Sequence, residues 1–165
     1  MTQFHLESGA DPERDAFVSA ALVAYNAGHS AMLRQRFDPQ HLKAVPVETY
    51  LLADNGEVMG GCTGRAVPLW GWLEIDLLWL HEALRGLGWG TQLLAAVEAQ
   101  AAALGCTRAK LSTWEFQAQP FYERQGYVVY AEEHDYPPGH TNYLMRKELA
   151  AREGAAGTAQ PSSTV

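Results

Sequence analysis

The spacing of apolar residues divides the chain into segments with a helical period and segments that alternate every second residue. Asp11-Pro12-Glu13 is a helix start with an acidic first turn, and one apolar face then continues to about Ala27. Residues 3–8 before it are expected to form a short strand. Residues 28–46 are irregular and are expected to contain a second short helix flanked by loops.

Residues 48–53 and 57–66 read as two strands of a hairpin. They are joined through Asp54-Asn55-Gly56, and Asn-Gly accepts positive φ angles at both central positions of a tight turn. Residues 71–80 continue the antiparallel order as the next strand. The middle of the chain therefore predicts an antiparallel sheet.

The clearest helix runs to Leu104, before Gly105, which is a typical helix stop. Its apolar face consists of Leu93, Leu94, Val97, Ala101 and Leu104. A strand at residues 107–114 follows, so strand, helix and strand form one right-handed parallel crossover. A helix at 120–125 and strands at 127–133 and 141–149 complete the pattern.

The turn between the strand at 71–80 and the long helix contains three glycines, Gly86, Gly88 and Gly90. Without a Cβ the backbone can take positive φ and come close to a ligand. The free N–H groups at a helix start, with the positive end of the helix dipole, favour a phosphate. The sequence therefore predicts a cradle for a phosphorylated cofactor.

Two common phosphate motifs do not fit this turn. A P-loop is excluded because no Gly-Lys-Ser/Thr follows. A dinucleotide fingerprint requires Gly-x-Gly-x-x-Gly, and here the third glycine comes one position too early. The next strand also carries no acidic residue before Glu115, where a ribose would need one.

Arg85-x-x-Gly88-x-Gly90 instead resembles the pyrophosphate loop of the GNAT superfamily of acyl-CoA-dependent N-acetyltransferases. A second motif strengthens the resemblance, because residues 118–127, Ala-Gln-Pro-Phe-Tyr-Glu-Arg-Gln-Gly-Tyr, are similar to the family's Ala-x-x-Phe-Tyr-x-x-x-Gly-Phe/Tyr helix. Both motifs and the elements around them cover residues 75–149. One position departs from the family pattern, since Glu115 stands where many members carry Asn.

The resemblance implies an α/β (α+β) fold with a mixed, mostly antiparallel central sheet of about seven strands flanked by about four helices. It also implies acetyl-CoA as cosubstrate. The residues expected to bind it are Leu78, Leu80, Arg85, Gly86, Leu87, Gly88, Trp89, Gly90, Thr91, Gln117 and Phe121.

Acyl transfer to an amine needs a route for the amine proton, because deprotonating a Lys-like amine at pH 7 costs about 4–5 kcal/mol. Period-2 alternation puts Trp72, Glu74, Asp76 and Leu78 on one side of their strand. The resemblance implies that Glu74, eleven residues before Arg85, is the base, with Asp76 as an alternative or a shaping residue. It implies in the same way that Tyr122 protonates the departing thiolate.

Composition is consistent with one domain over residues 1–149 and a disordered tail over 150–165, which is rich in Ala, Gly, Ser and Thr. The chain has 47% apolar residues and a net charge of −7, which argues against a nucleic-acid surface. It shows no membrane span or signal peptide, so a cytoplasmic location is expected. Cys62 and Cys106 are expected to be buried thiols, and no metal site is expected.

The sequence thus predicts an N-acetyltransferase that uses direct attack in a ternary complex. The acceptor amine is expected to bind against residues 26–41 and 134–140. A small-molecule amine is preferred as acceptor. A protein lysine or N-terminus, or a non-catalytic acyl-CoA-binding sensor, stays open as an alternative. A homodimer is compatible with such folds, but no feature fixes the oligomeric state.

Overall fold

The computed structural model describes residues 3–38 and 44–149. The chain divides into two compact units, Met1–Lys43 and Ala44–Val165. The tail predicted at 150–165 and the end of the expected acceptor segment at 39–41 lie outside the described residues.

The first unit consists of two consecutive helices, α1 (Pro12–His29) and α2 (Ala31–Arg36). Asp11 caps α1 as expected, because its carboxylate accepts hydrogen bonds from the backbone of Glu13 and Arg14. Ser30 ends α1 and caps α2. The strand predicted at residues 3–8 is wrong, since these residues adopt no regular structure and pair with no strand that the structure describes.

The second unit is built on a six-stranded sheet in the order β1-β2-β3-β4-β6-β5. The strands are β1 (Val45–Leu52), β2 (Val58–Val67), β3 (Trp72–Leu80), β4 (Arg108–Trp114), β5 (Val128–His134) and β6 (Thr141–Glu148). Every neighbouring pair is antiparallel except β3 and β4. The fold class predicted from the sequence is confirmed, with one strand fewer because residues 3–8 do not join the sheet.

The hairpin between β1 and β2 forms where the sequence predicts it, with a different turn. Gly56 takes φ 84°, but Asn55 does not take a positive φ. The Ala53 carbonyl accepts from Gly56 N, and Ala53 N donates to the Glu57 carbonyl, so the loop has three residues. This is the turn in which a single glycine supplies the left-handed position, so only one of the two expected positive φ angles is needed.

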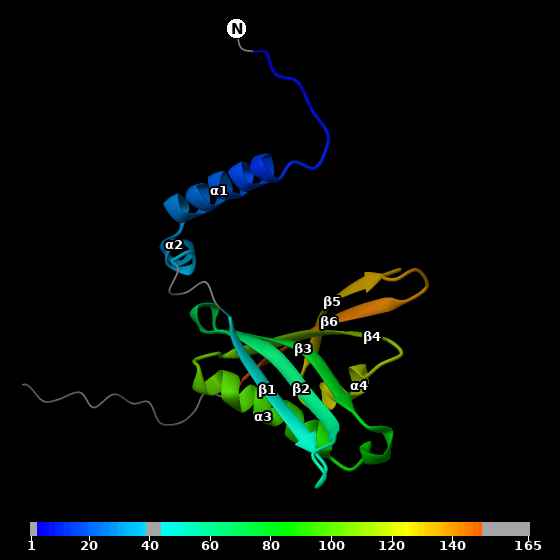
Figure 1. Ribbon diagram of the computed structural model, residues 1–165. Helices are drawn as coiled ribbons and strands as arrows, with labels where there is room; N and C mark the ends of the chain where they lie inside the picture. Colours follow the sequence, from blue (N-terminus) through cyan, green and yellow to red (C-terminus); the bar gives the residue numbers. More distant parts are fainter. Residues whose placement is uncertain (1–2, 39–43, 150–165) are drawn as a thin grey trace, which may run out of the picture. The chain divides into compact units, whose positions relative to one another are not determined.

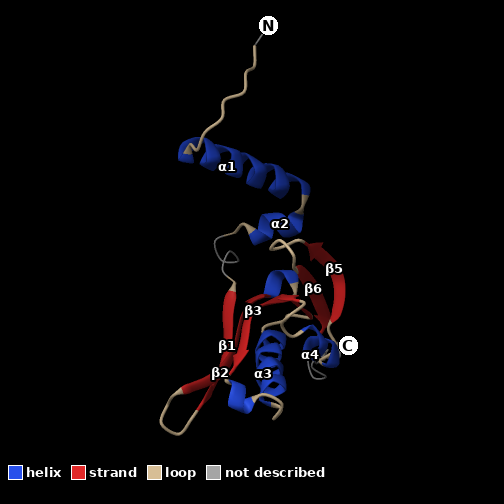
Figure 2. Cartoon of the chain, turned by 90° about the vertical axis from the view of Figure 1, so that its right-hand side faces the viewer, coloured by secondary structure: helices blue, strands red, loops and turns tan. Residues whose placement is uncertain are grey.

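Helix α3 (Trp89–Ala103) covers one face of β1, β2 and β3, and α4 (Gln119–Arg124) follows β4 (Figures 1 and 2). The predicted apolar face of α3 is buried in the core except for Leu104, which follows the helix and is exposed. Short 3-10 turns, η1 (Pro68–Trp70) and η2 (Glu82–Leu84), flank β3.

Cys62 and Cys106 are buried free thiols, as predicted. None of the helices in the described residues is long and apolar enough to cross a bilayer.

Candidate active site

Strands β3 and β4 are hydrogen-bonded along only part of their length. Their parallel pairing begins at Trp72 with Arg108 and ends at Glu74 with Lys110. Beyond this point β3 continues to Leu80 paired with β2, while β4 continues paired with β6. The two strands therefore part, and each presents an open edge toward the gap (Figure 1).

A β-bulge changes which side chains of β3 face the core. The register with β2 shifts at Asp76, which has no cross-strand partner. Ile75 is buried in the core before the bulge, and Leu78, three residues later, packs against the same core. Strict alternation would put these two on opposite faces. The prediction that Leu78 shares a side with Glu74 is therefore wrong, because the bulge turns Leu78 to the α3 side.

The predicted strand, glycine turn and helix start are confirmed. Gly86 has φ 77° and Gly88 has φ 85°, a region that side-chain-bearing residues rarely adopt. A Cβ at either position would meet no atom within 4 Å, so backbone conformation and not crowding requires glycine there. Helix α3 begins at Trp89, and its first N–H groups have no carbonyl partner within the helix.

A pocket of about 440 Å³ opens between the end of β3, the glycine turn and α4. Its lining residues are Leu78, Leu80, Arg85, Gly86, Gly88, Gly90, Thr91, Ala118, Phe121, Tyr122, Arg124 and Gln125. The structure thus brings most of the expected cofactor-binding residues together with Tyr122. Two guanidinium groups and a helix start on one pocket wall match the chemistry of a pyrophosphate.

Three residues expected at the cofactor do not line this pocket. Leu87 is 64% exposed and is not among the residues that line the pocket. Trp89 lines a separate small pocket beside Leu84. The Gln117 side-chain oxygen accepts hydrogen bonds from Trp114 N at 3.1 Å and from the Thr113 hydroxyl at 3.2 Å, so this side chain fixes the turn after β4.

Three lining residues were missed in the sequence: Ala118, Arg124 and Gln125. Ala118, Phe121, Tyr122 and Gln125 follow the spacing of one helical face, and that period could have identified two of them. Arg124 does not follow it, but it supplies the pocket with a second cation.

Tyr122 lines the pocket and is only 7% exposed. Its ring contacts the ring of Phe121 edge-on at 5.1 Å and the ring of Tyr127 at 5.8 Å. Burial, followed by the nearby Cys62 thiol, raises the pKa of Tyr122 to about 12. The hydroxyl therefore keeps its proton at neutral pH and is available as a donor.

Glu74 and Asp76 lie on the sheet face opposite α3 and are both engaged by cations. The Asp76 carboxylate accepts two hydrogen bonds from Arg65, each 3.0 Å long. The two Glu74 oxygens pair with Arg65 at 3.3 Å and with Lys110 at 2.8 Å. The expected pair of carboxylates is thus brought together, but as an ion-pair network that does not line the pocket.

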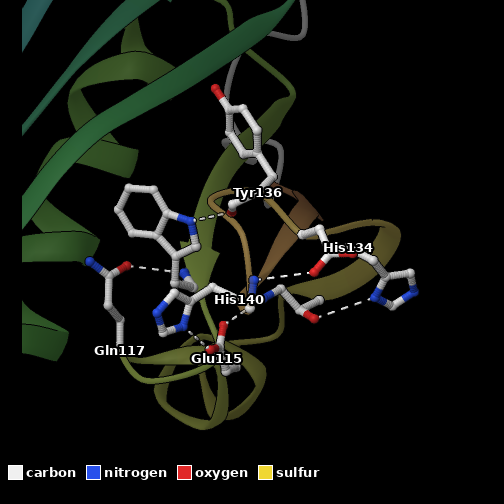
Figure 3. Close-up of polar contacts among 9 residues, drawn as sticks. Glu115, Gln117, His134, Tyr136 and His140 are labelled. Carbon is white, nitrogen blue, oxygen red and sulfur yellow. Dashed lines mark hydrogen bonds and ion pairs between the residues drawn. The ribbon is translucent and has the colours of Figure 1, made fainter.

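The turn after β4 is joined to the loop between β5 and β6 (Figure 3). Glu115 accepts from Thr141 N at 2.8 Å, and its other oxygen lies 2.6 Å from His140 Nδ1. The indole N–H of Trp114 donates to the Tyr136 carbonyl at 2.8 Å. The Glu in place of the family's Asn therefore holds this loop.

Buried neutral groups near Tyr122 make folding sensitive to alkaline pH. Burial, with a smaller effect of Glu98, raises the pKa of the Cys62 thiol from 9.0 to about 12. Between pH 9 and 12 the unfolded chain releases this proton and the folded chain keeps it. Unfolding free energy is unaffected below pH 9 and should then fall by up to about 1.4 kcal/mol per pH unit through this group.

Urea unfolding at pH 8, 9, 10 and 10.5 measures this loss. In the Cys62→Ala variant the stability curve should start lower, because a buried side chain is truncated, and should decline less steeply above pH 9. Parallel curves for the two proteins would contradict a buried neutral thiol.

The parted parallel strands, the glycine turn at a helix start and the cationic pocket define an acyl-CoA-dependent acyltransferase. No group of His, Cys, Asp or Glu suited to a metal ion occurs within residues 3–38 and 44–149. Comparison with known proteins identifies the class more closely. Residues 14–127 match the family described as Acetyltransferase (GNAT) family.

Two curated relatives are similar over most of the chain. The first is 41% identical over 132 residues, 78% of this chain and 96% of the relative, and is named Blasticidin-S acetyltransferase from Streptomyces morookaense. The second is Acetyltransferase Atu2258 from Agrobacterium fabrum, 33% identical over 76% of this chain and 83% of its own length.

Among solved structures, an acetyltransferase from Bacillus cereus superposes with a TM-score of 0.69 at 28% identity. The match covers 88% of this chain and 98% of that chain. The chain belongs to the GNAT family of acetyltransferases, which take the acetyl group from acetyl-CoA.

Proposed function

We propose that this protein acetylates a primary amine of a small molecule by direct attack on acetyl-CoA in a ternary complex. The observation that carries the proposal is the single pocket wall that joins a phosphate cradle to the side chain of Tyr122. A cosubstrate held at the cradle would bring its thioester toward Tyr122.

The phosphate end of the cosubstrate fits the glycine turn. Backbone N–H groups at the start of α3 and the guanidinium groups of Arg85 and Arg124 surround this part of the pocket. Arg85 is held in place because its Nε donates to the Leu80 carbonyl at 3.2 Å. Charge-assisted hydrogen bonds from both sources would bind a pyrophosphate.

The pantetheine arm fits the gap between β3 and β4. Backbone groups of β3 after Glu74 have no β4 partner, so they can pair with the amides of an extended chain. Leu78 and Leu80 offer apolar contacts along the same path. The bulge at Asp76 is what turns these two side chains toward the pocket.

At the thioester, the amine nitrogen would attack the carbonyl carbon while the bond from that carbon to sulfur breaks. Tyr122 would donate its proton to the departing sulfur, because its hydroxyl is protonated and lies in the pocket wall. A positioned acid of this kind typically contributes about 10²–10⁴ in rate. No covalent enzyme intermediate is required.

The name of the relative that shares 41% identity makes an antibiotic amine the first acceptor to test, and blasticidin S the first compound. A protein lysine or N-terminus is the second candidate, because the same fold accepts both kinds of amine. A sensor that binds acetyl-CoA without turnover is the third.

Calorimetric titration with acetyl-CoA, followed by thiol release over a panel of amines that includes blasticidin S and a lysine peptide, separates these candidates. We expect binding and amine-dependent thiol release with a small molecule. Release only with the peptide would overturn the small-molecule proposal, and binding without release for any amine would favour the sensor.

A glycine substitution tests the cradle itself. Gly88→Ala should weaken acetyl-CoA binding by about tenfold, because Ala disfavours the left-handed backbone by roughly 1–2 kcal/mol and shifts the N–H groups of the turn. Gly105→Ala is the matched control, since Gly105 has φ 96° and an equally open Cβ position but lies outside the pocket. Equal affinities in the two variants would contradict the cradle.

A further inference from the structure

The turn after β4 carries a carboxylate and an imidazole that the proposed chemistry has not yet used. Glu115 Oε1 lies 2.6 Å from His140 Nδ1, and Glu115 Oε2 accepts from Thr141 N at 2.8 Å (Figure 3). The hydrogen bond from His140 is the main cause that lowers the pKa of Glu115. The carboxylate is therefore ionised at neutral pH and fixed at both oxygens.

This contact decides which imidazole nitrogen can act. An ionised carboxylate only accepts hydrogen bonds, so Nδ1 carries the proton that is donated to Glu115. In the neutral ring the basic lone pair is then on Nε2. No side chain or backbone group of the described residues is hydrogen-bonded to that Nε2, and His140 is partly exposed.

The pair lies at the end of β4 that has parted from β3. Glu115 is three residues before Ala118, which lines the pocket wall that continues to Tyr122. The loop that carries His140 is held at this place a second time, because Trp114 Nε1 donates to the Tyr136 carbonyl. The Phe116 ring also meets the imidazole edge-on at 5.0 Å.

The acidic residues on β3 are less suited to take a proton from the acceptor. Arg65 and Lys110 occupy the Glu74 oxygens, and Arg65 occupies both oxygens of Asp76. An imidazole that has one nitrogen held by a hydrogen bond and the other nitrogen without one is better suited to accept this proton.

We infer that His140, oriented by Glu115, is the general base that removes a proton from the acceptor ammonium. The inference rests on the proposed function. The ammonium nitrogen loses two protons in forming the amide: one leaves on His140 Nε2 and passes to solvent. The other ends on the CoA sulfur through the Tyr122 hydroxyl, as the carbon–nitrogen bond forms and the carbon–sulfur bond breaks.

The other titratable groups near the loop are turned to partners of their own. Asp135 accepts from Gly139 N at 3.1 Å, and Glu133 accepts from Asn142 Nδ2 at 2.7 Å. His134 lies 3.3 Å from the Thr141 hydroxyl through Nδ1 and 3.6 Å from Glu132 through Nε2. Glu115 is thus the charged group paired with His140 among the described residues.

The first test is the pH dependence of kcat/KM in His140→Gln with an alkyl amine whose pKa is about 10. At pH 7 we expect a loss of about 10²-fold or more. Above pH 7 the rate of the variant should rise about tenfold per pH unit, because the variant must use the amine that is already deprotonated in solution. The rate of the native enzyme should rise less steeply, because it can also use the ammonium form.

The second test compares this amine with one of aromatic type that is neutral at pH 7. His140→Gln should act on the neutral amine at nearly the native rate, because no proton has to be removed before attack. A merely structural role of His140 would lower both rates alike and would overturn the inference. So would a pH profile that stays as shallow as the native one in His140→Gln and becomes steep in Glu74→Gln.

Glu115→Gln keeps an acceptor for Nδ1 but removes the charge opposite the imidazolium. Its pH profile should stay shallower than that of His140→Gln, and its loss at pH 7 should be smaller, because the ring is still oriented through Nδ1. His134→Gln, at the other end of the loop, should keep the shallow native pH profile. If the native protein binds acetyl-CoA but acetylates no amine, the proposed function fails, whereas an unchanged profile in both pair variants overturns only the base.

Discussion

Glu98→Ala should cost the 44–149 part of the chain about 3–5 kcal/mol of unfolding free energy. Glu98 lies on α3 and is only 13% exposed in its side chain. It pairs with Lys147 on β6 at 2.7 Å and accepts from the Tyr127 hydroxyl at 2.8 Å. Removing it leaves a mostly buried ammonium without a counter-charge and a buried hydroxyl without an acceptor.

Glu148→Ala is the matched control for this loss. It also removes a carboxylate that pairs with a cation, Arg108 at 3.0 Å, but the two side chains are 73% and 50% exposed. An exposed pair contributes about 0–1 kcal/mol, because water solvates both charges after the pair is broken. Urea midpoints at pH 7 give both values, and similar losses would show that burial does not set the cost.

The order of helices and strands in the second unit could be predicted because each element carries its own local signals. Gly105 ends α3 with φ 96°, and Gly126 ends α4 with φ 87°, so both helices end where glycine makes the left-handed cap easy. A strand, in contrast, depends on residues elsewhere in the chain for its hydrogen bonds. Residues 3–8 have a suitable pattern, but a strand exists only where another strand completes its hydrogen bonds.

The phosphate cradle and the Tyr122 helix could be found because each lies within one continuous motif. The surroundings of Glu74 could not, because Arg65 reaches it from β2 and Lys110 reaches it from β4. The bulge at Asp76 is also a property of two strands and has no single-residue signal. Register between strands, which the sequence does not specify locally, decided each of these features.

The pair of Glu115 and His140 shows the same limit in another form. The sequence marks Glu115 as a departure from the family pattern, and His140 is the last residue of the segment 134–140 that is expected near the acceptor. Their contact depends on how the β5–β6 loop returns to the end of β4, 25 residues along the chain. A departure from a family motif is therefore best interpreted through the residue that it contacts.

Tyr122→Phe should lower kcat for every acceptor amine by about 10²–10⁴-fold, because the departing thiolate loses its proton donor. Affinity for acetyl-CoA should stay within about twofold, since the phenyl ring keeps the wall of the pocket and the cradle is untouched. Stability should hardly change, because among the described residues no partner is hydrogen-bonded to this hydroxyl. Calorimetry and steady-state thiol release measure the two quantities.

Tyr127→Phe provides the opposite pattern and so separates catalysis from packing. Tyr127 is 2% exposed and its ring supports Tyr122, but its hydroxyl donates to Glu98 and does not line the pocket. Removing that hydroxyl should cost about 1–3 kcal/mol of stability, since the buried Glu98 loses a hydrogen bond, while the ring contact and kcat are kept. A similar fall in kcat for both variants would mean that Tyr122 acts through packing and not as the acid. Native kcat in Tyr122→Phe would transfer the role of acid to solvent or to another donor.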